Sequence, residues 1–122
     1  MLVLLVEDSP LEGLLQEHVL KTHGYDVQWV KDLQSAITRL HSIVPDIVAI
    51  DMILPDGIGT SLLPVIYSDP RLKNVKIIVT SGHERMVQGP HMQGVHKILV
   101  KSLDLVQLVK AIQEIIVSPS IG

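Results

Sequence analysis

The sequence contains no cysteine and no phenylalanine, and its only tyrosines and tryptophan are Tyr25, Tyr67 and Trp29. Without cysteine there is no disulfide framework, no thiolate nucleophile and no cysteine-type zinc site. With so few aromatic rings, the core has to be built from aliphatic side chains, and these are plentiful because 47% of the residues are hydrophobic. Such a composition argues against a disordered chain.

The chain also lacks an excess of basic residues and a long apolar run. Lys and Arg number 10 against 13 Asp and Glu, which gives a formal net charge of −3 and no basic surface for nucleic acid. Apolar runs are a few residues long, whereas a membrane span needs ~20. The apolar residues 1–6 are not preceded by a basic segment and are followed at once by acidic residues. We therefore expect a soluble, cytoplasmic protein that contacts neither nucleic acid nor a membrane directly.

A buried strand over residues 46–51 is the element around which the chain is organised. Its sequence, DIVAID, has four apolar residues in a row, three of them β-branched, which is typical of a strand buried on both faces. Asp51 ends this strand and a Pro/Gly-containing loop, 52–59, follows it. In an open parallel sheet, ligands bind at the loops that follow the strands. Asp51 is therefore a candidate reactive group.

Strand and helix patterns alternate along the rest of the chain. Further strands are predicted over 2–6, 25–30, 75–80 and 97–100, and the alternating pattern of 25–30 indicates an edge strand. Helices are predicted to begin after the N-cap residues Ser9, Asp32 and Asp104. A helix over about 60–67 should be kinked or shortened by Pro64, and one over 83–93 should be short because Gly89-Pro90 interrupts it.

Apolar residues at helical spacing mark the predicted helices. In the first helix, four residues lie at helical spacing: the apolar Leu14, Leu15 and Val19, and His18. In the second, the inward side chains are expected to be Leu33, Ala36, Ile37 and Leu40. In the last, the apolar stripe is Leu105, Leu108, Val109, Ile112 and Ile116.

Five strands alternating with five helices predict an α/β sandwich with right-handed crossovers. We expect the (βα)5 flavodoxin-like, doubly wound parallel sheet, with its strands in the order 2-1-3-4-5 counted along the chain. A single domain over 1–117 would be followed by a tail or the start of a linker at 118–122. This order puts the polar strand 25–30 at an edge and the ends of strands 2–6 and 46–51 beside the topological switch point.

These two strand ends carry Glu7, Asp8 and Asp51, and the flanking strands add Ser81 and Lys101. Three carboxylates at one place repel one another, and a hard divalent cation such as Mg²⁺ would relieve that repulsion. A lysine and a hydroxyl opposite the cation would suit the oxygens of a phosphoryl group. The arrangement predicts phosphoryl transfer to or from Asp51 through an aspartyl phosphate.

This set of residues resembles the receiver domain of two-component response regulators. The resemblance covers essentially the whole chain in order and is carried by Val6-Glu7-Asp8, Asp51, Pro55, Gly59, Ser81-Gly82 and Lys101. It implies that Asp51 accepts a phosphoryl group from the phosphohistidine of a sensor histidine kinase or a phosphotransfer protein in a phosphorelay. The domain would catalyse its own phosphorylation and dephosphorylation, but would act mainly as a switch for a downstream effector protein or domain.

The resemblance also implies roles for individual residues. Mg²⁺ would be held by Glu7, Asp8, Asp51 and the backbone carbonyl of Ile53. Ser81 matches the switch hydroxyl of the family, Gly82 its small residue beside the phosphoryl group, and Lys101 its lysine.

The chain departs from the family pattern at several positions. Ser102 follows Lys101 where proline is usual, so the peptide between them is expected to be trans. Ile98 occupies the place of the switch aromatic. Together with the short helix 83–93, these departures alter the usual output surface, formed by 83–93, 97–100 and the last helix. The same surface is the candidate contact of a homodimer.

Three other functions compete with a phosphorylated receiver. The departures at Ser102 and Ile98 motivate a pseudo-receiver, which would use the same fold as a phosphorylation-independent interaction module. An FMN-binding flavodoxin-like carrier is disfavoured because the loop 7–10 is acidic and has no phosphate cradle. A haloacid-dehalogenase-type phosphatase would require a second Asp where Ile53 stands.

Overall fold

The computed structural model describes residues 1–82, 94–100 and 106–117. Several predicted features lie outside the described residues. They are the helix over 83–93 with its Gly89-Pro90, Lys101, Ser102, the N-cap Asp104, Leu105 and the tail 118–122.

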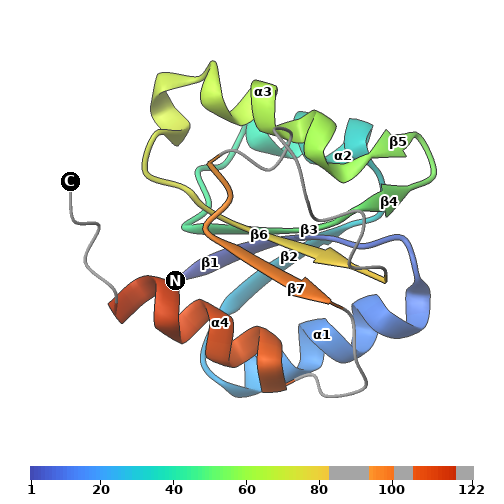
Figure 1. The fold of residues 1–122 in the computed structure, drawn as a ribbon, viewed down its shortest axis with the longest axis vertical. Coiled ribbons are helices and arrows are strands. Elements are labelled where there is room, and N and C mark those ends of the chain that lie inside the picture. The colour runs from blue at the N-terminus through green and yellow to red at the C-terminus, as the bar shows by residue number, and fades with distance from the viewer. Residues whose placement is uncertain (83–93, 101–105, 118–122) are drawn as a thin grey trace.

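A five-stranded parallel sheet forms the middle layer, in the order β2-β1-β3-β6-β7 (Figure 1). The strands are β1 (Leu2–Val6), β2 (Asp26–Val30), β3 (Ile47–Asp51), β6 (Lys76–Ser81) and β7 (Lys97–Val100). Since β6 and β7 are the fourth and fifth strands of this sheet along the chain, the predicted order 2-1-3-4-5 is confirmed. The prediction that the polar strand β2 lies at an edge is confirmed as well.

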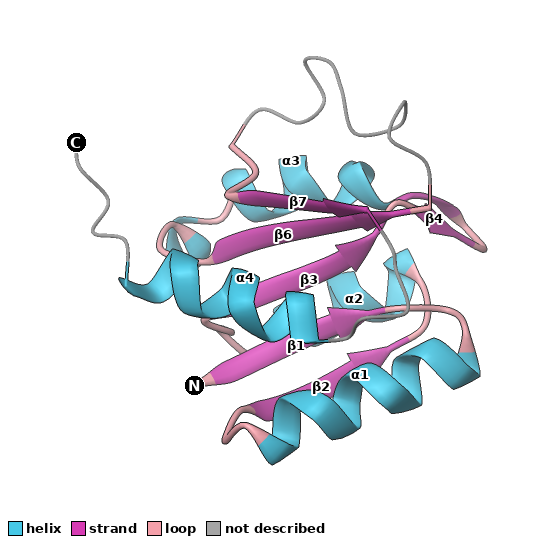
Figure 2. Cartoon of the chain, turned by 60° about the horizontal axis from the view of Figure 1, so that its bottom comes forward, coloured by secondary structure: helices cyan, strands magenta, loops and turns pink. Residues whose placement is uncertain are grey.

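Helices cover both faces of the sheet (Figures 1 and 2). On one face lie α1 (Pro10–Thr22) and α4 (Val106–Val117), which are at the front in Figure 2. On the other lie α2 (Leu33–Leu40), the 3-10 helix η1 (Gly59–Leu62) and α3 (Leu63–Tyr67), and a second 3-10 turn, η2 (Pro70–Leu72), leads towards β6. Among the described residues, no helix is both long enough and apolar enough to cross a membrane.

The core consists of two aliphatic clusters, one on each face of the sheet. Because successive side chains of a strand point to opposite faces, β1 and β3 supply both clusters. The α2 face receives Leu4, Val6, Val48 and Ile50. The α1 face receives Val3, Leu5, Ile47 and Ala49. The described core is aliphatic, as the scarcity of aromatic residues predicted.

The segment between β3 and β6 contains a feature that the sequence did not indicate. Residues 52–59 were predicted as a loop, but β4 (Ile53–Leu54) and β5 (Gly57–Ile58) form a short antiparallel hairpin there. After the hairpin, the predicted helix 60–67 is divided into η1 and the five-residue α3. Pro64 lies in the first turn of α3, where its missing N–H is tolerated, so the predicted shortening is confirmed.

Helix α1 buries a different face from the one that its apolar spacing marks. Leu14 and Leu15 are 58% and 43% exposed, whereas Gly13, Gln16 and Leu20 are buried. Gly13 faces inward because the ring of Trp29 in β2 occupies the space beside it. Gln16 faces inward because its side-chain amide donates a hydrogen bond to the buried carboxylate of Glu7. Local polar and steric demands, which spacing alone does not reveal, set the rotation of this helix.

The other two amphipathic helices follow the prediction more closely. In α2, Leu33, Ala36 and Leu40 are buried and Ile37 is half-buried. In α4, the placement of Ile116 in the buried stripe was wrong, because its side chain is 40% exposed and the neighbouring Ile115 is 8% exposed. Ile115 lies in the same row as Leu108 and Ala111, at spacings of three and four residues, and this row faces the sheet.

His96 joins β7 to β6 just before the β7 ladder begins. Its backbone N–H donates to the carbonyl of Ile77 at 2.9 Å, and its Nδ1 accepts from the N–H of Ile77 at 2.9 Å. Nδ1 can accept only while the imidazole is neutral. Partial burial, and to a smaller extent the charge of Lys76, hold the pKa of His96 below its ordinary value of 6.5.

We expect this contact to make the fold sensitive to mild acid. Because the folded-state pKa lies below the unfolded one, the stabilisation is complete above about pH 6.5 and is lost as the pH falls towards the folded pKa. The thermal midpoint should therefore fall between about pH 7 and pH 5, and less steeply in His96→Asn, whose amide oxygen replaces Nδ1. His23→Asn is the control. The Nδ1 of His23 faces the carbonyl oxygen of Val19 and so has to donate, which does not require a neutral ring. Equal slopes in the two variants would contradict this assignment.

Candidate functional site

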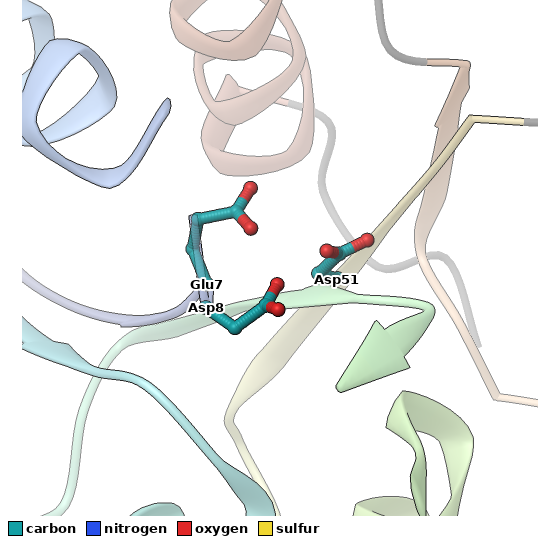
Figure 3. Close-up of side chains that lie close together, drawn as sticks. All are labelled: Glu7, Asp8 and Asp51. Carbon is teal, nitrogen blue, oxygen red and sulfur yellow. The ribbon is translucent and has the colours of Figure 1, made fainter. Parts of the chain in front are cut away.

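Three carboxylates meet at the carboxyl ends of β1 and β3. Glu7 and Asp8 directly follow β1, and Asp51 is the last residue of the adjacent β3, where Val6 is in register with Ile50. One oxygen from each carboxylate lies within 4.8 Å of the others. Glu7 and Asp51 are 1% and 7% exposed, whereas Asp8 is exposed, and Figure 3 shows the three groups around one space.

This donor set fits a hard divalent cation. Three like charges within 4.8 Å repel one another, and two of them have lost most of their contact with water. Carboxylate oxygens are the ligands that Mg²⁺ takes in proteins, together with water and phosphate oxygens. The exposed Asp8 leaves the group open to solvent, so water or a phosphoryl group can complete the coordination.

The buried Glu7 is held by three neighbouring segments. Its carboxylate accepts hydrogen bonds from the backbone N–H of Ser9 and from Nε2 of Gln16, both at 3.3 Å. Its backbone carbonyl accepts one from the indole Nε1 of Trp29 at 2.8 Å. Sequence reasoning missed both Gln16 and Trp29. The one available signal was that Trp29 is the only tryptophan of the chain, whereas the apolar spacing of the helix did not mark Gln16 as an inward position.

Gly59 allows the chain to pass close behind Asp51. Its N–H donates to the carbonyl of Met52 at 2.7 Å, which closes the hairpin segment upon itself. A Cβ at this position would lie 2.0 Å from the backbone oxygen of Asp51 and 2.7 Å from Cγ2 of Ile50. Only glycine therefore fits here without moving the backbone of Asp51.

The β4–β5 hairpin is anchored to the N-terminus of α2 by Asp56. The two oxygens of Asp56 accept the backbone N–H groups of Leu33 and Gln34 at 2.9 and 3.0 Å, and these bonds lower the pKa of Asp56. The N-cap Asp32 accepts the N–H of Ser35 at 2.7 Å, as its position predicted. Asp56 is a second carboxylate at this helix end, and sequence reasoning missed it because it lies 23 residues from Leu33.

The remaining predicted site residues lie on β4, β6 and β7 or outside the described part of the chain. Ser81 is fully buried at the end of β6, one residue beyond Thr80, which is the register partner of Asp51. The side chain of Ile53 is 56% exposed in β4, and that of Ile98 is 37% exposed in β7. Lys101 lies outside the described residues.

Comparison with known proteins identifies the family. The family model of the response regulator receiver domain matches residues 3–113. The chain belongs to this family. The receiver domain that the sequence motifs resembled is thereby confirmed, and the carboxylate cluster lies within the matched range.

Curated relatives place this receiver domain among proteins of different lengths. It is 32% identical over 124 residues to response regulator Rcp1 of Synechocystis, covering 93% of this chain and 84% of Rcp1. It is 38% identical over 61 residues to the transcriptional regulatory protein TrcR of Mycobacterium tuberculosis, covering 50% of this chain and 24% of TrcR.

Solved structures share the fold of this receiver domain. The response regulator TrrA of Thermotoga maritima, solved in complex with Mg²⁺ and BeF, aligns with a TM-score of 0.85 at 21% identity over 93% of this chain and 97% of that one. A CheY-like receiver domain from Methylobacillus flagellatus aligns with a TM-score of 0.86 at 24% identity, covering 94% and 98% of the two chains. The flavodoxin-like sheet is the architecture that these proteins have in common.

Proposed function

We propose that the chain is a phosphoacceptor receiver, which takes a phosphoryl group onto Asp51 with Mg²⁺ and switches a partner protein or a downstream domain. The observation that carries this proposal is the carboxylate cluster, in which buried Glu7 and Asp51 lie with exposed Asp8 within 4.8 Å. A sensor histidine kinase or a phosphotransfer protein would be the donor, and we expect this exchange in the cytoplasm. A homodimer through β7, α4 and residues 83–93 belongs to the same proposal.

The chemistry assigned to Asp51 is an in-line phosphoryl transfer. A carboxylate oxygen of Asp51 attacks the phosphorus atom as the P–N bond to the donor histidine breaks. The departing imidazole nitrogen takes up a proton. Bound Mg²⁺ would supply positive charge against the phosphoryl oxygens. Glu7, Asp8 and the carbonyl of Ile53 are the groups we assign to hold it.

The residues opposite the acidic cluster complete the proposed site. We assign Lys101 to the phosphoryl oxygens and Ser81 to the switch hydroxyl, as the family resemblance implies. Ser81 lies on the strand adjacent to Asp51, which is compatible with that role. At Ile98 a half-exposed aliphatic side chain stands in the switch position. Any switch in this chain would therefore work without a moving aromatic ring at that position.

Acetyl phosphate, or beryllofluoride with Mg²⁺, tests the proposed function directly. A phosphoacceptor receiver should show amide NMR shifts around residues 7, 8, 51 and 81 on addition of either reagent, and EDTA should abolish them. A pseudo-receiver would show no such shifts in Mg²⁺. In that case, the phosphoacceptor function is wrong and the interaction module replaces it.

The lifetime of the phosphorylated form should depend on Ile53. Hydrolysis requires a water molecule held in line with the bond to Asp51. The side chain of Ile53 is 56% exposed beside this position in sequence and offers no hydrogen bond to such a water. We expect Ile53→Asn to hydrolyse faster than the wild-type protein, by about 10-fold or less. The second position expected to flank the line of water attack is His83, two residues past Ser81 and outside the described residues. Phosphoryl lifetimes measured for Ile53→Asn and His83→Ala in parallel would decide which of the two positions controls hydrolysis. No effect of Ile53→Asn with much slower hydrolysis in His83→Ala would contradict the prediction.

Exposed leucines of α1 offer a surface for the protein donor. Leu11, Leu14 and Leu15 are 68%, 58% and 43% exposed in the half of α1 that begins next to the carboxylate cluster. We propose that the phosphodonor packs on these leucines. Leu14→Glu should slow transfer from a phosphohistidine protein by about 10-fold or more, since a charge would replace an apolar side chain that the docked donor covers. Labelling by acetyl phosphate should be unchanged, and equal slowing with both donors would contradict this docking site.

A further inference from the structure

Trp29 connects the edge strand β2 to the backbone of the acidic pair. Its indole Nε1 donates to the carbonyl oxygen of Glu7 at 2.8 Å. The N–H of Glu7 donates in turn to the carbonyl of Val30 at 3.0 Å. Glu7 lies one residue beyond the end of β1, so the indole holds a peptide that the strand itself no longer includes.

The peptide held by the indole is the one that leads into Asp8. The carboxylate of Glu7 is oriented by its own hydrogen bonds, from Ser9 and Gln16. No comparable side-chain bond orients the carboxylate of Asp8 in the described part of the chain, and this group is exposed. The direction of Asp8 therefore depends on its backbone, and the plane of the Glu7–Asp8 peptide is fixed by Trp29.

The indole itself is confined on the α1 side by a glycine. A Cβ at Gly13 would lie 2.0 Å from Cζ2 and 2.2 Å from Cε2 of Trp29, so the ring fills the place of a side chain on this helix. The ammonium of Lys31 lies 5.3 Å from the ring centroid, within the range of a cation–π contact. With these contacts, the half-buried ring has little freedom to turn its N–H away from Glu7.

We propose that Trp29 is a positioning residue for the metal site, which directs Asp8 towards Asp51 by holding the carbonyl of Glu7. The inference rests on the proposed function, because it takes the three carboxylates to be Mg²⁺ ligands. It assigns to Trp29 no contact with the metal or with the phosphoryl group. Its effect would pass through one peptide unit.

The single tryptophan makes a clean replacement feasible. Incorporating benzothienylalanine at position 29 keeps the shape of the ring system but replaces the indole N–H with sulfur. Mg²⁺ affinity would be measured by NMR titration of the amides of residues 7, 8 and 51, and stability by thermal unfolding. Losing one hydrogen bond to a ligand-bearing peptide should weaken Mg²⁺ binding about three- to tenfold. Tyr25→Phe, which alters another aromatic side chain packed against the same core cluster, is the matched control and should bind normally.

A second readout uses the wild-type protein. The one indole N–H resonance should be protected from exchange and should shift on addition of Mg²⁺, although the metal does not touch the ring. An unchanged Mg²⁺ affinity in the benzothienyl protein would overturn the inference. So would a loss of affinity matched by a large fall in thermal midpoint, since that would indicate a purely structural role. If unsubstituted protein shows no Mg²⁺-dependent shifts at residues 7, 8 and 51, the proposed function itself fails.

Discussion

Asp51→Asn should abolish phosphoryl uptake from acetyl phosphate while leaving the protein folded. The amide has nearly the same shape as the carboxylate but has no anionic oxygen to attack phosphorus. The absence of the mass increase of one phosphoryl group, in intact-protein mass spectrometry, is the expected result. Asp26→Asn is the matched control, because it removes the same charge from an exposed position at the opposite end of the strands, and it should label like wild type.

The same variant should also report on the repulsion within the cluster. Asn at position 51 removes one of three negative charges that lie within 4.8 Å, so in metal-free buffer the free energy of unfolding should rise by on the order of 1 kcal/mol. Added Mg²⁺ should then stabilise the variant less than the wild-type protein. A variant that still takes up phosphate would show that another residue is the acceptor.

Gly59→Ala should be the most damaging small substitution near the site. The new methyl group would lie 2.0 Å from the backbone oxygen of Asp51, a contact that only movement of the backbone can relieve. Overpacking of this kind costs about 1–3 kcal/mol of unfolding free energy, and here the moving atom belongs to the acceptor residue. Mg²⁺ affinity and labelling should therefore fall together with stability, as measured by urea unfolding and by the NMR titration.

Gly82→Ala provides the control for this substitution. No atom of the described residues lies within 4 Å of a Cβ at Gly82, and its φ is not in the left-handed region. Its free energy of unfolding should stay within about 0.5 kcal/mol of the wild-type value. If the two alanine variants lose the same free energy of unfolding, the close approach of Gly59 to the backbone of Asp51 is not the cause of the loss.

Strands and their order were predictable because each buried strand is a short, nearly continuous apolar run. The apolar run of β3 is typical of a strand buried on both faces. Right-handed crossovers then allow few strand orders for a sheet that contains it. The meeting of Glu7, Asp8 and Asp51 followed from the same order, since parallel strands end at a common edge. Together with Pro55, Gly59, Ser81-Gly82 and Lys101, these strand ends carried the resemblance to the family that the comparison confirmed.

Other features depended on contacts between distant residues. The rotation of α1 is set by the fit of Trp29 against Gly13 and by the bond from Gln16 to Glu7, and apolar spacing contains neither contact. The anchoring of the β4–β5 hairpin required Asp56 to meet the N–H groups of α2, more than 20 residues away. Contacts between residues so far apart in the sequence depend on the tertiary structure, so local sequence patterns do not predict them.

The strand order has a consequence for how the protein forms during synthesis. β1, the first strand to be made, lies between β2 and β3, so its pairing on both sides is complete once residue 51 has been added. All three carboxylates of the cluster belong to that same N-terminal portion. A domain generally folds as a unit, however, and β6 supplies residues to both core clusters. The carboxylate cluster is therefore encoded early in the chain but becomes stable only when β6 pairs with the free edge of β3.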